Sequence, residues 1–170
     1  MSNFKPYLPE ENAKIVVMST NNKELVKRVE ELGVKVLPSE NLSKLLTFEQ
    51  YHTDLQFLHY NKDTVFVLKE CTSLKENLKK YFPNVIEISK NIDKDYPNNV
   101  MLNCVVLNDK LICNSKTIAD EVLQMAIKDN LKIINVNQGY TKCSTCIVNE
   151  NAIITSDKSQ DTLQYLIPLQ

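Results

Sequence analysis

Two short stretches of the chain carry side chains that can do chemistry together. One holds two thiols three positions apart, Cys143-Ser-Thr-Cys146, and the other holds an imidazole and a carboxylate two positions apart, His52-Thr-Asp54. A thiolate attacks electrophilic carbon, histidine moves protons near neutral pH, and a carboxylate pairs with a planar cation. These residue types fit a cysteine-dependent reaction, provided that the fold brings the two stretches together.

The cysteine pair has competing interpretations: a redox couple, half of a zinc site, a nucleophile with a bystander, or the inside of a strand. A thioredoxin-like couple opens a helix, whereas "CIVNENAII" predicts strand, turn and strand. Alternation along a strand would place Cys146 on the face opposite Cys143, so Cys146 is expected to pack. For Cys143 two interpretations stay open, a nucleophile or a small buried strand residue.

A metal site and a cofactor are not expected. Zinc takes about four ligands, and the other cysteines, Cys71, Cys104 and Cys113, include no second closely spaced pair, so zinc is a minor alternative. With only two glycines, the chain has no glycine-rich loop that could hold a phosphate-bearing cofactor.

The composition predicts one ordinary globular domain over residues 1–170. A hydrophobic content of 43% suffices for a core, and the net charge of -1 gives no reason to expect nucleic acid or an anionic membrane as partner. The N-terminus has no apolar run long enough for a signal peptide or a membrane span. We therefore expect a cytoplasmic protein whose five cysteines are reduced thiols.

A unit of helix, strand, loop and two-stranded hairpin recurs along the chain. We place its copies at 14–70, 71–116 and 117–158, with an incomplete fourth at 159–170; the hairpin turns carry Asp63, Asp109 and Glu150. Stacked units bury their apolar faces on their neighbours, so an open arc of three exposes both ends. We expect self-association through these ends, or a chain that is a truncated piece of a longer ring.

Within the first unit, the periodicity predicts a helix whose apolar face carries Leu25, Val29 and Leu32. The alternation in "YHTDLQF" predicts a strand, which would turn His52 and Asp54 to one side. The alternative is that His52 and Asp54 simply belong to a solvated face of the strand. His59, close to the hairpin turn, is expected to be exposed.

Helix-and-sheet units repeated around an axis resemble the pentein fold, a five-bladed α/β propeller shared by arginine deiminases, dimethylarginine hydrolases and amidinotransferases. "YHTDLQF" resembles the His-x-Asp strand of the deiminases, and "GYTKCST" resembles the family's Gly-rich segment ending in Cys and Thr. The chain is also similar to an uncharacterised group of bacterial pentein-like proteins that share "NQGYTKCST" and "AIITSDK". The resemblance implies an α/β fold, a partial pentein-like propeller.

The resemblance also implies roles for individual residues. Cys143 would be the nucleophile, His52 the proton shuttle and Asp54 the carboxylate that holds the substrate. Asn103, at the matching place in the second hairpin, and Gly139 would contact the substrate too, although Asn103 is equally expected as a polar strand residue.

The implied function is hydrolysis or transfer on a small guanidine- or amidine-containing molecule without a cofactor. The alternative is a non-catalytic binding or interaction protein, or an inactive truncated remnant, on the same scaffold.

Overall fold

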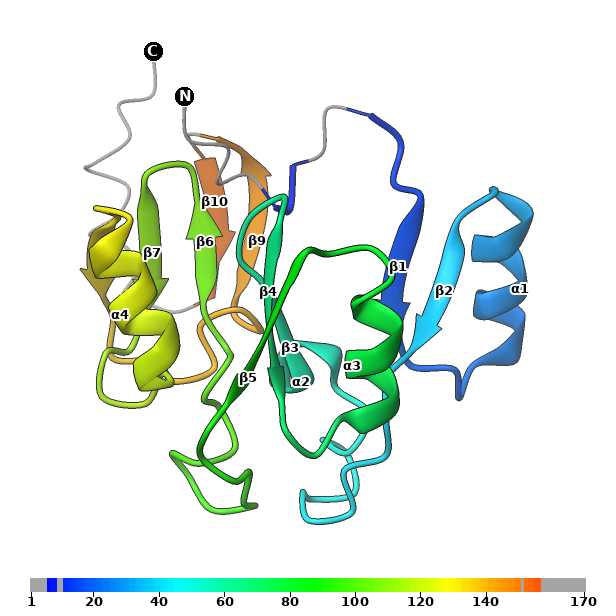
Figure 1. The fold of residues 1–170 in the computed structure, drawn as a ribbon, viewed down its shortest axis with the longest axis horizontal. Coiled ribbons are helices and arrows are strands. Elements are labelled where there is room, and N and C mark those ends of the chain that lie inside the picture. Colours follow the sequence, from blue (N-terminus) through cyan, green and yellow to red (C-terminus); the bar gives the residue numbers. More distant parts are fainter. Residues whose placement is uncertain (1–5, 9–10, 151, 157–170) are drawn as a thin grey trace.

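The computed structural model describes residues 6–8, 11–150 and 152–156, which form a mixed α/β fold with several small sheets (Figure 1). A three-stranded sheet lies in the middle of the chain, made of β3 (Phe57–His59), β4 (Thr64–Leu68) and β5 (Asn84–Ile88). β3 and β4 form an antiparallel hairpin, α3 (Thr72–Leu78) follows, and β5 returns parallel to β4.

The next segment repeats this arrangement. β6 (Val105–Leu107) and β7 (Lys110–Cys113) form a hairpin, α4 (Asp120–Lys128) follows, and β8 (Lys132–Asn135) pairs parallel with β7. The structural unit is therefore a hairpin, a helix and a parallel strand. The expected boundaries at 70/71 and 116/117 fall inside these units, between each hairpin and the helix that follows it.

Incomplete versions of the same unit precede and follow these two units in the chain. β1 (Ile15–Met18), α1 (Lys23–Glu31) and β2 (Lys35–Pro38) form a helix-connected parallel pair, and β9 (Thr145–Asn149) and β10 (Ala152–Thr155) form an antiparallel hairpin. Figure 1 places α1 and its two strands at one end of the molecule and α4 at the other. The expected fourth unit at 159–170 lies outside the described residues.

The main core lies around the middle strands and between the sheets and their helices. All five residues of β4, "TVFVL", are buried, as in a central strand that is covered on both faces. α3 buries Leu74 and Leu78 against this core, and α4 buries Val122 and Ala126. Burial of these apolar faces is the main stabilising contribution to the two complete units.

The first helix forms where the sequence predicts it, but its apolar face is only partly covered. Asn22 caps α1 by accepting the Leu25 N–H at 3.0 Å, and Gly33 follows the helix with a φ of 76°, a conformation that suits glycine. None of the helix residues is buried, and the side chains of Leu25 and Leu32 are 46% and 81% exposed. The helix is held by its caps and by local contacts with β2.

The strand predicted for "YHTDLQF" is wrong in its first half. Residues Thr53–Gln56 form the short helix α2, and β3 begins only at Phe57. Leu55 and Gln56 are both buried, which a strand with one covered face does not allow for neighbouring residues. The Gln56 amide pairs with the backbone of Glu40, accepting its N–H at 2.8 Å and donating to its carbonyl at 2.7 Å. This distant contact draws the segment inward as a helical turn.

The prediction that His59 is exposed is also wrong. Its ring is half-buried, with edge contacts to the rings of Tyr7 and Phe82. Burial lowers the pKa of His59, and its Nε2 has no hydrogen-bond partner among the described residues. The hairpin turn itself is exposed at Lys62 and Asp63, but the strand that leads into it is covered.

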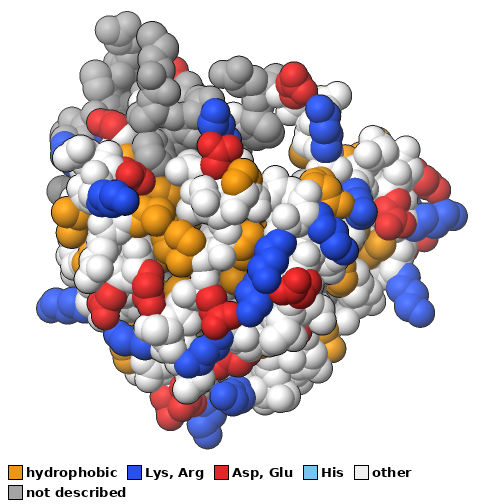
Figure 2. All heavy atoms as spheres, viewed as in Figure 1, with side chains coloured by type: hydrophobic (Ala, Val, Ile, Leu, Met, Phe, Trp, Pro, Cys, Tyr) orange, Lys and Arg blue, Asp and Glu red, His pale blue; other side chains and the backbone are white. Residues whose placement is uncertain are grey.

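The surface carries mixed charge. Figure 2 shows basic and acidic side chains interspersed on the face drawn, without a large field of one sign. None of the described helices is long and apolar enough to cross a membrane.

Candidate active site

The candidate site forms where three loops meet, and each loop leads into the first strand of a hairpin. Asp54 lies in α2 just before β3, Asn103 just before β6 at Val105, and Cys143 just before β9 at Thr145. The three residues therefore occupy equivalent places in successive units. Their side chains contact one another although they are far apart in sequence.

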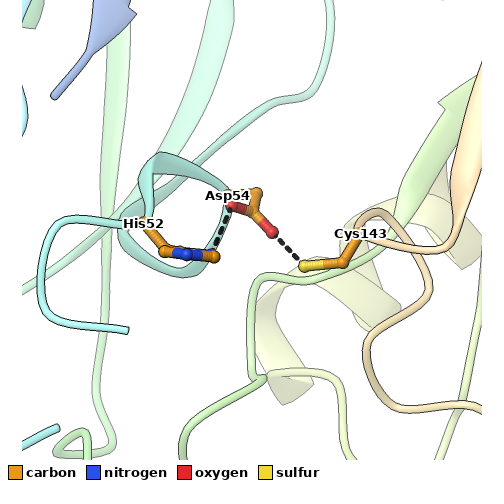
Figure 3. A group of neighbouring side chains, drawn as sticks. All are labelled: His52, Asp54 and Cys143. Atoms are coloured by element: carbon orange, nitrogen blue, oxygen red, sulfur yellow. Dashed lines mark hydrogen bonds and ion pairs between the residues drawn. The ribbon is translucent and has the colours of Figure 1, made fainter. Parts of the chain in front are cut away.

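The carboxylate of Asp54 lies between the thiol and the imidazole. The Cys143 Sγ donates a hydrogen bond to Asp54 Oδ2 at 2.5 Å, and His52 Nδ1 lies 3.8 Å from Asp54 Oδ1 (Figure 3). The potential ligand atoms of the three residues all lie within 4.8 Å of one another. His52 and Cys143 are exposed, so a molecule from solvent can reach the group.

Asn103 contacts both Asp54 and Cys143. It is 1% exposed, and its Nδ2 donates to Asp54 Oδ2 at 2.6 Å and to Cys143 Sγ at 3.2 Å. Its Oδ1 accepts the backbone N–H groups of Lys142 at 2.7 Å and Cys143 at 3.3 Å. These contacts with protein groups fit a residue that positions the carboxylate and the thiol.

The resting thiol is protonated at neutral pH. Burial raises the pKa of Cys143 to about 12, and the hydrogen bond and charge of Asp54 act in the same direction, opposed by Asn103. Although Cys143 as a residue is exposed, its sulfur faces Asp54 and the buried Asn103, which accounts for the effect of burial. A thiol with this pKa needs a nearby positive charge before it can act as a nucleophile.

The neighbouring lysine lies over an aromatic ring. Lys142 Nζ lies 4.1 Å from the centre of the Tyr7 ring, a cation–π contact. Burial lowers the pKa of Lys142, while the negative charge of Asp54 opposes that shift.

A second buried cluster joins the same three loops, and the sequence did not predict it. The Tyr140 hydroxyl donates to Glu49 Oε1 at 2.7 Å, and the Asn99 amide contacts both the Tyr140 hydroxyl and Glu49 Oε1. Glu49 and Asn99 are 5% and 3% exposed. The signal available in the sequence was a second polar residue a few positions before each of Asp54, Asn103 and Cys143, but polar loop residues are too common for this to stand out.

Gly139 lies beneath an aromatic side chain. A Cβ at this position would meet the Tyr96 ring, at 2.6 Å from Cε2 and 2.8 Å from the hydroxyl oxygen. The absence of a side chain at Gly139 thus allows the loop that carries Tyr96 to pack on the segment leading to Cys143. The described contact of Gly139 is with the protein itself.

The expectation that Cys146 packs away from solvent is wrong. Cys143 belongs to the turn at 141–144, ahead of β9, so strand alternation does not relate it to Cys146. Both cysteines are exposed, and both line one hollow of about 330 Å³. The other three cysteines are buried.

Within the part of the chain that the structure describes, His52, Asp54 and Cys143 form a group that could hold a metal ion. Imidazole, carboxylate and thiolate are all zinc ligands, and three protein ligands with an open fourth position are typical of catalytic zinc sites. To bind zinc, Cys143 would have to lose the proton that it now donates to Asp54.

Comparison with known proteins gives a family but no activity. No curated protein matches the chain. Two solved structures of the agmatine deiminase of C. jejuni are similar: one with substrate bound, at 20% identity and a TM-score of 0.47, and another at 19% and 0.46. Each match covers 72% of this chain and 46% of the deiminase, so the chain spans about half the length of these proteins. A family model described as "Family of unknown function (DUF6873)" matches residues 16–162, and the chain therefore belongs to this family.

Proposed function

We propose that the chain is a cysteine-dependent hydrolase or transferase that acts on a guanidine or amidine, built on a partial pentein-like propeller. The observation that carries the proposal is the position of the Asp54 carboxylate, in hydrogen-bond contact with the Cys143 thiol and 3.8 Å from His52. A nucleophile, a proton carrier and an anion for a planar cation thus occupy one accessible group.

Substrate binding would begin at Asp54. A guanidinium or amidinium ion presents N–H donors in a plane, and a carboxylate accepts two of them at once. To do so, Asp54 exchanges its bond to the thiol for bonds to the substrate. The substrate's positive charge then lies beside the sulfur, which lowers the pKa of the Cys143 thiol from its resting value of about 12. The nucleophile is therefore activated by the substrate and stays inert without it.

The chemistry follows from these positions. The thiol proton passes to His52, directly or through water, and the sulfur forms a bond to the central carbon of the substrate. His52 returns a proton to the departing nitrogen, which leaves as an amine or ammonia. His52 then takes a proton from water, whose oxygen attacks the carbon and releases the sulfur, giving a urea or amide product. In a transferase, an acceptor amine takes the place of water. The thiol must stay reduced for each cycle, a condition that the cytoplasm maintains.

The test is turnover by Cys143→Ala in a panel of guanidino and amidino compounds that differ in the charge of their tails. Released ammonia and ureido products are measured for the parent, for Cys143→Ala, and for Cys146→Ala as the matched control with an exposed thiol removed nearby. We expect turnover by the parent and by Cys146→Ala and none by Cys143→Ala. Equal turnover by Cys143→Ala and the parent, or none by any of the three, would remove Cys143 from the mechanism.

A second candidate, a guanidino-binding protein without catalysis, is favoured by the protonated state of the resting thiol. In that case Asp54 would bind the cation and Cys143 would never attack. Calorimetry on the same panel separates the two, because binding that Asp54→Asn abolishes, without turnover by the parent, is the result expected of a binding protein only.

A further inference from the structure

We infer that Cys143 and Cys146 form a reversible intramolecular disulfide, and that this pair is a modification site for hydroperoxides. Of the five cysteines, these two are exposed and the other three are buried. Both exposed cysteines line the hollow of about 330 Å³, along with Ile154 and Thr155 of β10. An oxidant from solvent thus meets two thiols in one place.

The backbone around Cys143 is folded into a turn just ahead of the strand that carries Cys146. The Ser144 N–H donates to the Tyr140 carbonyl at 3.1 Å and the Thr145 N–H donates to the Lys142 carbonyl at 3.2 Å, the bonds of a helical turn. Cys143 lies in this turn and Cys146 is the second residue of β9, three positions on, and both line the same hollow. A disulfide requires Cβ atoms about 3.5–4.5 Å apart, so its formation requires the backbone to adjust where the turn joins β9.

The disulfide and the resting arrangement of the site exclude each other. The Cys143 sulfur now donates to Asp54 Oδ2 and accepts from Asn103 Nδ2. To bond with Cys146 it must rotate away from both. The sulfur therefore has two positions, one on Asp54 and one on Cys146.

The oxidation begins at Cys146. The Cys146 thiol loses its proton to solvent, and the thiolate attacks a hydroperoxide oxygen, giving a sulfenic acid and an alcohol, or water when the oxidant is hydrogen peroxide. Cys143 then gives up its proton, for which the Asp54 carboxylate is the adjacent acceptor, and its sulfur attacks the Cys146 sulfur. The S–O bond breaks and the hydroxyl leaves as water. Two thiols are oxidised to a disulfide and one peroxide is reduced, and an external dithiol reverses the change.

The consequence for activity rests on the proposed function, because a sulfur bonded to Cys146 cannot attack a substrate. The disulfide itself does not depend on that function. Sequence alternation argued against a redox couple here; the turn ahead of β9 removes that objection.

The experiment uses the full chain treated with hydrogen peroxide, digested without reductant and analysed by mass spectrometry. Trypsin cleaves after Lys142 and Lys158, so both cysteines stay in one peptide, 143–158. We expect this peptide to lose the mass of two hydrogen atoms, to resist alkylation, and to regain two alkylation sites after treatment with dithiothreitol. Cys146→Ser, checked for folding by circular dichroism, should instead gain oxygen on Cys143 or remain a free thiol.

Gain of oxygen by the parent peptide, intermolecular disulfides, or two unmodified thiols after peroxide would overturn the inference. The readout needs no substrate, so it separates this inference from the proposed function. A disulfide in a protein that turns over no guanidino compound leaves the inference intact and refutes the function. Cys143-dependent turnover without a disulfide supports the proposed function and refutes the inference.

Discussion

At the scale of single residues, the site holds its thiol in an unreactive state. Asp54 raises the pKa of Cys143 by accepting its hydrogen bond and by its negative charge, in addition to the larger effect of burial. The same carboxylate is the group that would bind a cationic substrate. Asp54 thus keeps the Cys143 thiol unreactive while the site is empty. When a cationic substrate occupies the site and binds Asp54, the thiol would become reactive.

This link predicts that Asp54→Asn makes Cys143 more reactive in the free protein. Removing the negative charge lowers the thiol pKa from its value of about 12, so more thiolate is present at any pH below it. Each unit of pKa is worth about tenfold in thiolate, or about 1.4 kcal/mol. The rate of alkylation of Cys143 by iodoacetamide should rise at least several-fold between about pH 7 and 9, measured in a Cys146→Ala background.

The matched control is Asp63→Asn, which removes an exposed carboxylate in a hairpin turn away from the thiol. It should leave the alkylation rate unchanged. A rate for Asp54→Asn equal to or below that of the parent would show that Asp54 does not hold the thiol in its protonated form.

At the scale of secondary-structure elements, periodicity predicted the long helices but not the short one. The apolar spacing around Leu25 and Val122 marks α1 and α4, because those helices are long enough for a 3.6-residue repeat to show. α2 has four residues, and its form depends on the bonds between Gln56 and the backbone of Glu40. No local pattern encodes such a contact, so the sequence predicted a strand there.

Periodicity also could not tell which apolar helix faces are covered. The stripes of α1 and α3 look alike in sequence, yet Leu74 in α3 is fully buried and Leu25 in α1 is 46% exposed. Burial depends on which elements lie against the helix, and this is a property of the tertiary fold.

The two helices give a matched pair of substitutions. Leu74→Ala should lower the free energy of unfolding by about 2–5 kcal/mol, because it leaves a cavity in the core. Leu25→Ala should lower it by less than about 1 kcal/mol, because the side chain already meets water and alanine favours a helix. Urea unfolding followed by circular dichroism measures both. A loss for Leu25→Ala as large as that for Leu74→Ala, growing with protein concentration, would show instead that a second copy covers α1.

At the scale of the whole molecule, the site exists only when distant loops come together. The Cys143–Asp54 contact joins residues 89 positions apart, and the Tyr140–Glu49 contact joins residues 91 positions apart. The sequence could propose His52, Asp54 and Cys143 because their side chains are chemically distinctive. It could not propose Glu49, which differs from the exposed glutamates only in its buried partners.

The Tyr140–Glu49 contact should therefore contribute measurably to the stability of the entire fold. Tyr140→Phe removes the hydroxyl that donates to Glu49 at 2.7 Å. Among the described residues this leaves that carboxylate, 5% exposed, with the Asn99 amide at 3.4 Å as its remaining partner. An inadequately paired buried carboxylate costs about 1–3 kcal/mol or more. The free energy of unfolding of Tyr140→Phe should therefore be lower than that of the parent by this amount. Tyr51→Phe is the matched control, since the Tyr51 hydroxyl accepts from Asn41 at an exposed position, and it should change the stability by no more than about 0.5 kcal/mol. Both variants should unfold in one transition, as judged by circular dichroism and by the exposure of the three buried cysteines to a thiol reagent. Equal stability of the two variants would show that Glu49 and Tyr140 do not join the loops in solution. Two separate transitions would show that the units unfold independently.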